Sequence, residues 1–173
     1  QRVVPWADIR SEQETEARIH EALPPDKYSL LHEWRHDTPP LLRKLVDLHA
    51  GSSGWKLLLD SDMLFFRRPD LLIDWLRCPS KPCFMVDVSS FYAYSSQLRY
   101  NLVESPIPEA VNVGVLGLKS EDVNFDQMQE WLKILLRNEG TKYPLDQPLC
   151  SLMLAGRDCT IAPPDKYIVL PSL

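Results

Sequence analysis

The sequence predicts a single α/β domain over residues 1–173, with a mixed, mainly parallel central sheet flanked by helices. Two observations predict this class. Short apolar runs alternate with amphipathic helical patterns along the chain, and no repeat, linker or low-complexity tract interrupts them. The composition, with 45% hydrophobic and 25% charged residues among 173, is that of an ordinary globular domain with a sizeable core.

Helix signals are clear at several places. Ser11 precedes a segment with acids in its first turn and apolar residues on one face, which ends at Pro24. A loop rich in Pro and His is expected next. Thr38 is a plausible N-cap for the following helix, which stops at Gly51. The predicted helices cover residues 11–23, 41–50, 69–77 and 125–139, with a further one that begins at Asp146.

The predicted strands are short apolar runs that lie between these helices. Strands of this length and composition are typical of a sheet that is covered on both faces. A mixed segment, 91–102, remains without an assignment. The predicted strands are 55–60, 83–88, 111–118, 159–162 and 167–170.

Charge and composition exclude some classes of function. A formal net charge of −5 and a pI near 5.4 argue against a nucleic-acid-binding domain, which needs a basic face. No apolar run approaches the ~20 residues of a membrane span. The cysteines lie at no zinc spacing, so reduced thiols in a cytoplasmic protein are expected. The four histidines also lie at no metal spacing and are expected at the surface or in loops.

The most informative stretch is Trp55 to Leu72, WKLLLDSDMLFFRRPDLL. Side chains at i and i+2 of an extended chain point the same way, so Asp60 and Asp62 should face a common point while Ser61 points away. In open α/β sheets, ligands bind at the carboxyl ends of strands. Two converging carboxylates repel unless a cation neutralises them, so Mn²⁺ or Mg²⁺ is the expected partner.

This stretch resembles the DxD motif of glycosyltransferases with the GT-A fold, as seen in bacterial glycosyltransferases and the glycogenin-like group. Further matches follow in the expected order. Arg43 and Lys44 resemble the basic residues that approach the nucleotide-sugar in those enzymes. Asn112 and Gly114 resemble the N-x-G strand beside the donor sugar, and Asp146-Gln147 resembles the D-Q pair near the sugar and acceptor.

The resemblance implies a Rossmann-like nucleotide-diphospho-sugar transferase fold and transfer of a sugar from a nucleotide-diphosphate donor to an acceptor, with a weak hint of retention. The metal would be held by Asp60 and Asp62. The same resemblance implies a first strand-helix unit that these residues lack, so a partial domain is expected. The residues that it implies at the site are Asp146 and Gln147 for catalysis and Arg43, Lys44, Asp60, Ser61, Asn112 and Gly114 for the substrate.

Other interpretations remain open. Adjacent residues on a helix lie about 100° apart, so Arg43 and Lys44 cannot both face one ligand. Asp146 is also a reasonable N-cap, and the glycine strand is also typical of a β-bulge. The alternative functions are a non-catalytic sugar- or nucleotide-binding domain of the same fold and, less favoured, a phosphohydrolase of the haloacid-dehalogenase type.

Overall fold

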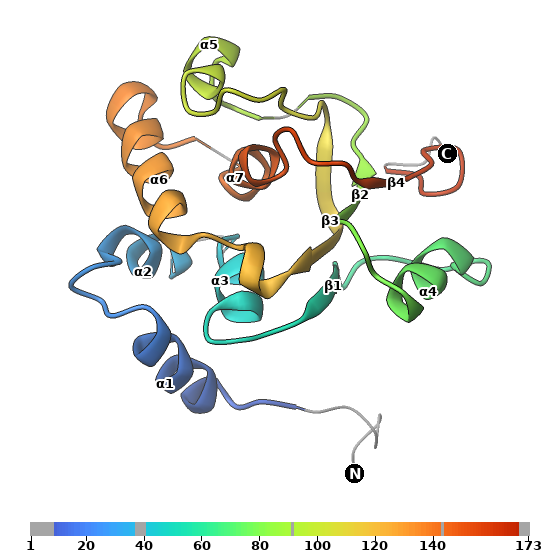
Figure 1. Ribbon diagram of the computed structural model, residues 1–173, viewed down its shortest axis with the longest axis horizontal. Helices are drawn as coiled ribbons and strands as arrows, with labels where there is room; N and C mark the ends of the chain where they lie inside the picture. Colours follow the sequence, from blue (N-terminus) through green and yellow to red (C-terminus); the bar gives the residue numbers. More distant parts are fainter. Residues whose placement is uncertain (1–8, 37–40, 91, 143, 170–173) are drawn as a thin grey trace.

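A four-stranded sheet lies between a large helical layer and a smaller one (Figure 1). The computed structural model describes residues 9–36, 41–90, 92–142 and 144–169. The strands are β1 (Trp55–Leu59), β2 (Cys83–Val86), β3 (Val111–Lys119) and β4 (Thr160–Ala162). The helices are α1 (Glu12–Ala22), α2 (Ser29–Arg35), α3 (Arg43–His49), α4 (Asp70–Arg77), α5 (Ser96–Tyr100), the 3₁₀-helix η1 (Ser120–Asp122), α6 (Phe125–Glu139) and α7 (Asp146–Met153).

The sheet is mixed but not mainly parallel, so that part of the predicted fold class is wrong. The strand order is β1-β3-β2-β4, and β3 is antiparallel to both β1 and β2, whereas β2 and β4 are parallel. Three strands therefore run in one direction, as the alternation of strands and helices predicts. The reversed strand occupies a central position, so both of its pairings are antiparallel.

The reversal of β3 follows from the connection that precedes it. A parallel neighbour needs a crossover helix that packs across the sheet, whereas an antiparallel one can be reached by a loop at one edge. The segment between β2 and β3 contains only the short helix α5. Its two ends meet where the Asp87 N–H donates to the Ala110 carbonyl at 2.7 Å. β3 therefore begins at the same edge of the sheet at which β2 ends.

A bulge interrupts the pairing of β2 with β3. Phe84 pairs with Leu116, but the next residue, Met85, pairs with Asn112. Extra residues of β3, among them Gly114, therefore lie opposite a single step of β2. Bulges bend a strand and re-aim its side chains, and this one lies at the end of the sheet that carries Asp60 and Asp87.

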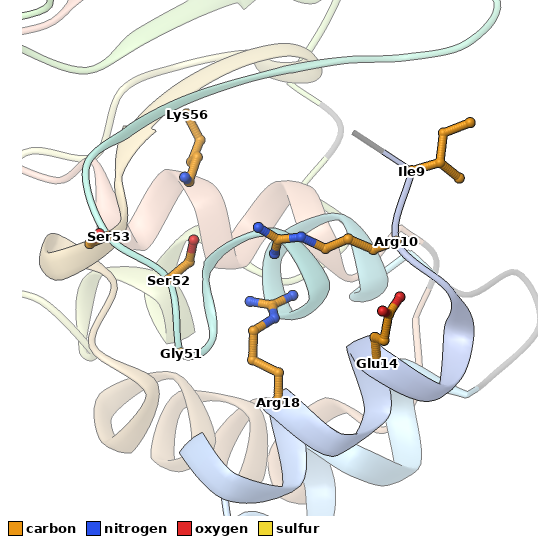
Figure 2. Close-up of a pocket in the computed structure, with 8 residues that line it drawn as sticks. All are labelled: Ile9, Arg10, Glu14, Arg18, Gly51, Ser52, Ser53 and Lys56. Atoms are coloured by element: carbon orange, nitrogen blue, oxygen red, sulfur yellow. The ribbon is translucent and has the colours of Figure 1, made fainter. Parts of the chain in front are cut away.

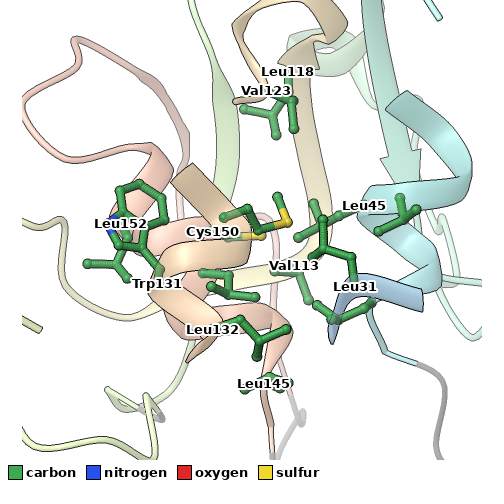
Figure 3. Close-up of a cluster of buried hydrophobic side chains, with 14 of the residues drawn as sticks. Leu31, Leu45, Val113, Leu118, Val123, Trp131, Leu132, Leu145, Cys150 and Leu152 are labelled. Carbon is green, nitrogen blue, oxygen red and sulfur yellow. The ribbon is translucent and has the colours of Figure 1, made fainter. Parts of the chain in front are cut away.

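The main core fills the face of the sheet covered by α1, α2, α3, α6 and α7. Figure 3 shows its centre, where α6 and α7 pack against β3; the labelled residues are Leu31, Leu45, Val113, Leu118, Val123, Trp131, Leu132, Leu145, Cys150 and Leu152. A smaller cluster on the other face joins α4 to the sheet through Leu72, Trp75 and Val115. Both faces are covered, as expected for short apolar strands.

All five predicted helices are present, and the departures lie where local signals are weak. Ser11 and Glu14 form the capping box of α1, in which each side chain bonds the other residue's backbone N–H. The predicted loop after Pro24 instead contains α2. The predicted strand 167–170 is wrong over its described residues, 167–169, which have no strand structure. Thr38 lies outside the described residues.

The four cysteines are free, as predicted. Within the described ranges, no helix is both long and apolar enough to cross a lipid bilayer. Surface placement of the histidines is wrong for His49, which is 3% exposed. Its Nδ1 lies 3.0 Å from the Ser120 hydroxyl, because α3 packs against η1.

We expect the burial of His49 to make the protein less stable in mild acid. Burial, with a smaller contribution from the positive charge of Lys56, lowers the pKa of His49 from 6.5 to about 4. Between pH 6.5 and pH 4, His49 is therefore protonated in the unfolded chain and neutral in the folded chain. The free energy of unfolding should be unaffected by this group above pH 6.5 and fall by about 3 kcal/mol as the pH drops to 4.

Urea denaturation at several pH values would measure this effect, with the His49→Gln variant as the comparison. The variant should lack the His49 component of the slope between pH 6.5 and 4. An NMR titration that placed the pKa of His49 near 6.5 in the folded protein would contradict the prediction.

Candidate functional site

Polar side chains from three strand ends meet at one edge of the sheet. Asp60 follows β1, Asp87 follows β2, and Asn112 lies at the start of β3. Because β3 runs against β1 and β2, its beginning lies beside their ends. The Asp60 N–H donates to the Gly114 carbonyl at 2.9 Å, which ties the end of β1 to the bulge.

Asp87 joins the amides of two other elements. Its Oδ2 accepts a hydrogen bond from Asn112 Nδ2 at 2.8 Å and another from Gln147 Nε2 at 3.1 Å. Its Oδ1 accepts from the backbone N–H of Val88 at 2.7 Å. A carboxylate that holds two amides fixes both of their orientations. The sequence signal for Asp87 was only its place at a strand end, which gave no specific role.

The side-chain oxygens of these two amides, Asn112 Oδ1 and Gln147 Oε1, differ in their hydrogen bonding. Asn112 Oδ1 accepts from the Gly114 N–H at 2.7 Å, a local bond that holds the bulge. Gln147 Oε1 is buried and has no hydrogen-bond partner among the residues that the structure describes. A buried acceptor without a partner costs free energy that a hydroxyl or water at this position would recover.

Lys44 brings a positive charge from α3 to the same edge. Its Nζ lies 2.7 Å from Asp60 Oδ1 and 3.9 Å from Asp146 Oδ2. Arg43, the neighbouring residue, points elsewhere and pairs with Asp47 at 3.1 Å and with Glu12 at 3.4 Å. The structure thus separates the two basic residues, as their helical spacing requires, and places only Lys44 at this edge.

Asp146 is the most buried acid of the group, at 2% exposed. Burial raises the pKa of its carboxyl above the usual value, and the nearby Lys44 partly opposes this change. Asp146 Oδ1 accepts from the Gln147 N–H at 3.0 Å. The N-cap position of α7 belongs to Leu145, without a side-chain bond, so Asp146 is the first helical residue instead.

The extended conformation from which Asp60 and Asp62 were expected to point the same way is not present. β1 ends at Leu59, and the Met63 N–H bonds the Asp60 carbonyl at 3.3 Å, so the chain turns where an extended strand was expected. The alternation of an extended chain no longer applies there. Asp60 is half-buried against Lys44, whereas Ser61 and Asp62 are exposed.

The donor set meets only the minimum for a divalent ion. Within the described part of the chain, no group of three or more His, Cys, Asp or Glu side chains is arranged to hold a metal. Mg²⁺ and Mn²⁺ need only one or two carboxylates where water and substrate phosphate complete the shell. Asp60 and Asp62 are the two carboxylates expected in this role, and Asp60 already accepts a hydrogen bond from Lys44.

Gly114 has no side chain and so leaves room for the side chains of Asn112 and Asp60. A Cβ at this position would lie 2.8 Å from Asn112 Oδ1 and 3.5 Å from Asp60 Oδ2. Any side chain would therefore push the Asn112 amide out of place. Six of the residues that the sequence suggested lie together here: Lys44, Asp60, Asn112, Gly114, Asp146 and Gln147. We call these six and Asp87 the polar edge.

Comparisons with models of protein families, with curated proteins and with solved structures found no match for this chain.

Proposed function

We propose that this chain is a glycosyltransferase that binds a nucleotide-diphosphate sugar at the polar edge and transfers the sugar to an acceptor. The observation that carries the proposal is the convergence of Lys44, Asp146 and Gln147 on Asp60 and the β3 bulge. Short polar groups fixed on rigid elements suit the recognition of a sugar. Gln147 Oε1, which has no hydrogen-bond partner among the described residues, would accept from a sugar hydroxyl after a small movement that uncovers it.

The residues divide by the part of the substrate they would contact. Asn112 and Gln147 would hold sugar hydroxyls, and Asp87 would keep both amides in position. Asp146 would accept a hydrogen bond from a hydroxyl on the sugar or the acceptor. Lys44 would exchange part of its contact with Asp60 for phosphate oxygens, as a compact charge on a flexible chain can do.

Asp60 and Asp62 would hold Mn²⁺ or Mg²⁺, which would offset the charge that develops on the departing diphosphate. One variant, Asp62→Ala, tests this assignment of the metal ligands. Asp62→Ala should remove metal-dependent nucleotide binding and leave the free energy of unfolding within about 0.5 kcal/mol, since the replaced side chain is exposed.

Calorimetric titration of UDP, GDP and ADP, with and without Mn²⁺, would test both the proposal and the variant. We expect one nucleotide to bind only with the metal. Asp158→Ala provides a matched control, because Asp158 is also an exposed acid and pairs with Lys81 away from the polar edge. Full metal-dependent binding by Asp62→Ala would refute the metal assignment.

A second function has its own supporting observation. This second function is the binding of a sugar or nucleotide without metal and without turnover. It is supported by the ion pair of Lys44 with Asp60, which neutralises the Asp60 carboxylate without a metal ion. Release of free nucleotide from a bound donor separates the two functions. The glycosyltransferase would release it steadily in the presence of Mn²⁺ and acceptor or water, whereas the binding domain would hold the donor unchanged.

A further inference from the structure

A polar hollow lies at the end of β1 opposite the polar edge. Its cavity is about 750 Å³ and is bounded by α1 and by the loop between α3 and β1. A volume of this size lies within the range of small-molecule sites, roughly 300–1,000 Å³. The lining residues are Ile9, Arg10, Glu14, Arg18, Gly51, Ser52, Ser53 and Lys56. We call this the α1 pocket.

Three cationic side chains point into the α1 pocket. Figure 2 shows the guanidinium groups of Arg10 and Arg18 close to each other, with the Lys56 ammonium and the Ser52 hydroxyl facing the same space. Glu14 is the acid among the lining residues. Its Oε2 accepts from the backbone N–H and the hydroxyl of Ser11, both at 2.8 Å, and the nearby charge of Arg10 also contributes to lowering its pKa.

The charged guanidinium group of Arg18 donates its hydrogen bonds to neutral groups. Its two terminal nitrogens donate to the backbone carbonyls of Asp47 and Ala50, at the end of α3. Its Nε is buried and lacks a hydrogen-bond partner in the described part of the chain. Burial and the nearby Arg10 lower the pKa of the Arg18 guanidinium, and the attraction of Asp47 does not offset them. A nearby anion would relieve this excess of positive charge.

The backbone of the pocket allows α1 to come close. Gly51 has a φ of +60°, and a Cβ there would lie 3.1 Å from Arg18 Cγ and 3.2 Å from Ala22 Cβ. A larger residue would push α1, and with it Arg18, away from the loop. Gly51 readily adopts this positive φ and has no side chain, so α1 can lie close to the loop. This close packing places the cationic side chains around one pocket.

We infer that the α1 pocket binds a phosphate-bearing small molecule, with Arg10, Arg18 and Lys56 around the phosphate and Ser52 as an additional hydrogen-bond partner. Arginine forks match the several oxygens of a phosphate, and a lysine adds a point charge. The volume leaves room for an organic group beside the phosphate.

The α1 pocket is separate from the polar edge. Lys56 lies near the start of β1 and Asp60 follows its end, a separation of four residues that corresponds to about 13 Å along a strand. Binding at one site can thus be disrupted without a change at the other. This separation also makes the inference independent of the proposed function.

Inorganic phosphate and pyrophosphate are the first probes, titrated by calorimetry against the whole chain at constant ionic strength. Constant salt matters because exposed charges are strongly screened. We expect binding that weakens about 10-fold in Lys56→Gln and in Arg10→Gln, as for loss of one charged hydrogen bond. Arg18 is left intact because it also holds the end of α3.

A control variant makes the outcome specific. Lys133→Gln removes an exposed lysine on α6 and should keep the wild-type affinity for phosphate. No binding to the wild type, an equal loss in Lys133→Gln, or an unchanged affinity in Lys56→Gln would overturn the inference.

A phosphate group could also come from a lipid. Sedimentation with vesicles that contain phosphatidic acid distinguishes this source from a free ligand. We expect the protein to stay in the supernatant at vesicle concentrations where pyrophosphate binds. Sedimentation that Lys56→Gln abolishes, together with no binding of free phosphate or pyrophosphate, would overturn the assignment to a small molecule.

Discussion

Replacement of Gly117 by valine should lower the free energy of unfolding by about 3 kcal/mol, the upper part of the range for overpacking a core. Gly117 lies in the centre of β3, between Leu57 of β1 and Cys83 of β2. Even a single Cβ there would lie 2.6 Å from Trp75 Cζ2 and 2.7 Å from Cη2. The ring of Trp75 occupies the space that a side chain would need.

Trp75 has little freedom to move away. It is 6% exposed, and its Nε1 donates to the Lys81 carbonyl at 2.8 Å. Its ring also contacts that of Trp55 edge to face, with the centroids 5.5 Å apart. A branched side chain at position 117 must therefore displace α4 or separate β3 from its neighbours, and both changes expose apolar surface.

Urea denaturation followed by fluorescence would measure the loss, with a variant of Trp75 as the comparison. Combining Gly117→Val with Trp75→Leu should cost less than the sum of the single variants. Additive losses would show that the two side chains do not conflict.

The elements that sequence patterns predict well are those with complete local signals. α1 has its capping box at Ser11 and Glu14, and α6 has an apolar stripe that ends at Gly140. The pattern failed for α2, where the surrounding Pro and His residues suggested a loop. The helix is stabilised instead by distant partners: Arg35 is fully buried and pairs with Glu16 and Asp47, which lie on α1 and α3.

The direction of β3 could not be obtained from local patterns. Strand direction depends on whether a connection crosses the sheet, and the segment 87–110 gave no assignment that could decide this. The convergence of the polar edge has the same origin. Asp60 was expected there because it follows a strand, but the contribution of Asn112 depends on β3 beginning beside the ends of β1 and β2.

The choice between Arg43 and Lys44 illustrates another limit. Helical spacing correctly indicates that only one of them faces the site. Which one depends on the rotation of α3 about its axis, and the packing of Leu45, Val46 and His49 against the core fixes that rotation. Similarly, the strand rule for Asp60 and Asp62 fails because the chain turns one residue earlier than the apolar run suggests.

Asp146→Asn should weaken function and strengthen the fold at the same time. Burial raises the pKa of Asp146, so the folded protein holds its proton more tightly than the unfolded chain. The stability of this site is therefore greatest at low pH and falls as the pH rises through the folded pKa. Asparagine is neutral and of the same shape, so the variant should be at least as stable as the wild type at pH 7.

The side-chain oxygen of asparagine can still accept from the Gln147 N–H, and Lys44 keeps Asp60 as its partner. The start of α7 should therefore not change. Under the proposed function, Asp146 accepts a hydrogen bond from a hydroxyl of the sugar or the acceptor, and a carboxylate accepts such a bond more strongly than an amide does. On that basis we expect kcat/KM for sugar transfer to fall roughly 10- to 100-fold.

The two measurements together separate a functional acid from a structural one. A structural Asp146 would give a less stable variant and leave transfer by the folded fraction unchanged. A functional Asp146 gives a variant that unfolds at the same or a higher urea concentration and transfers poorly. Wild-type kcat/KM in a stable Asp146→Asn protein would remove Asp146 from the site.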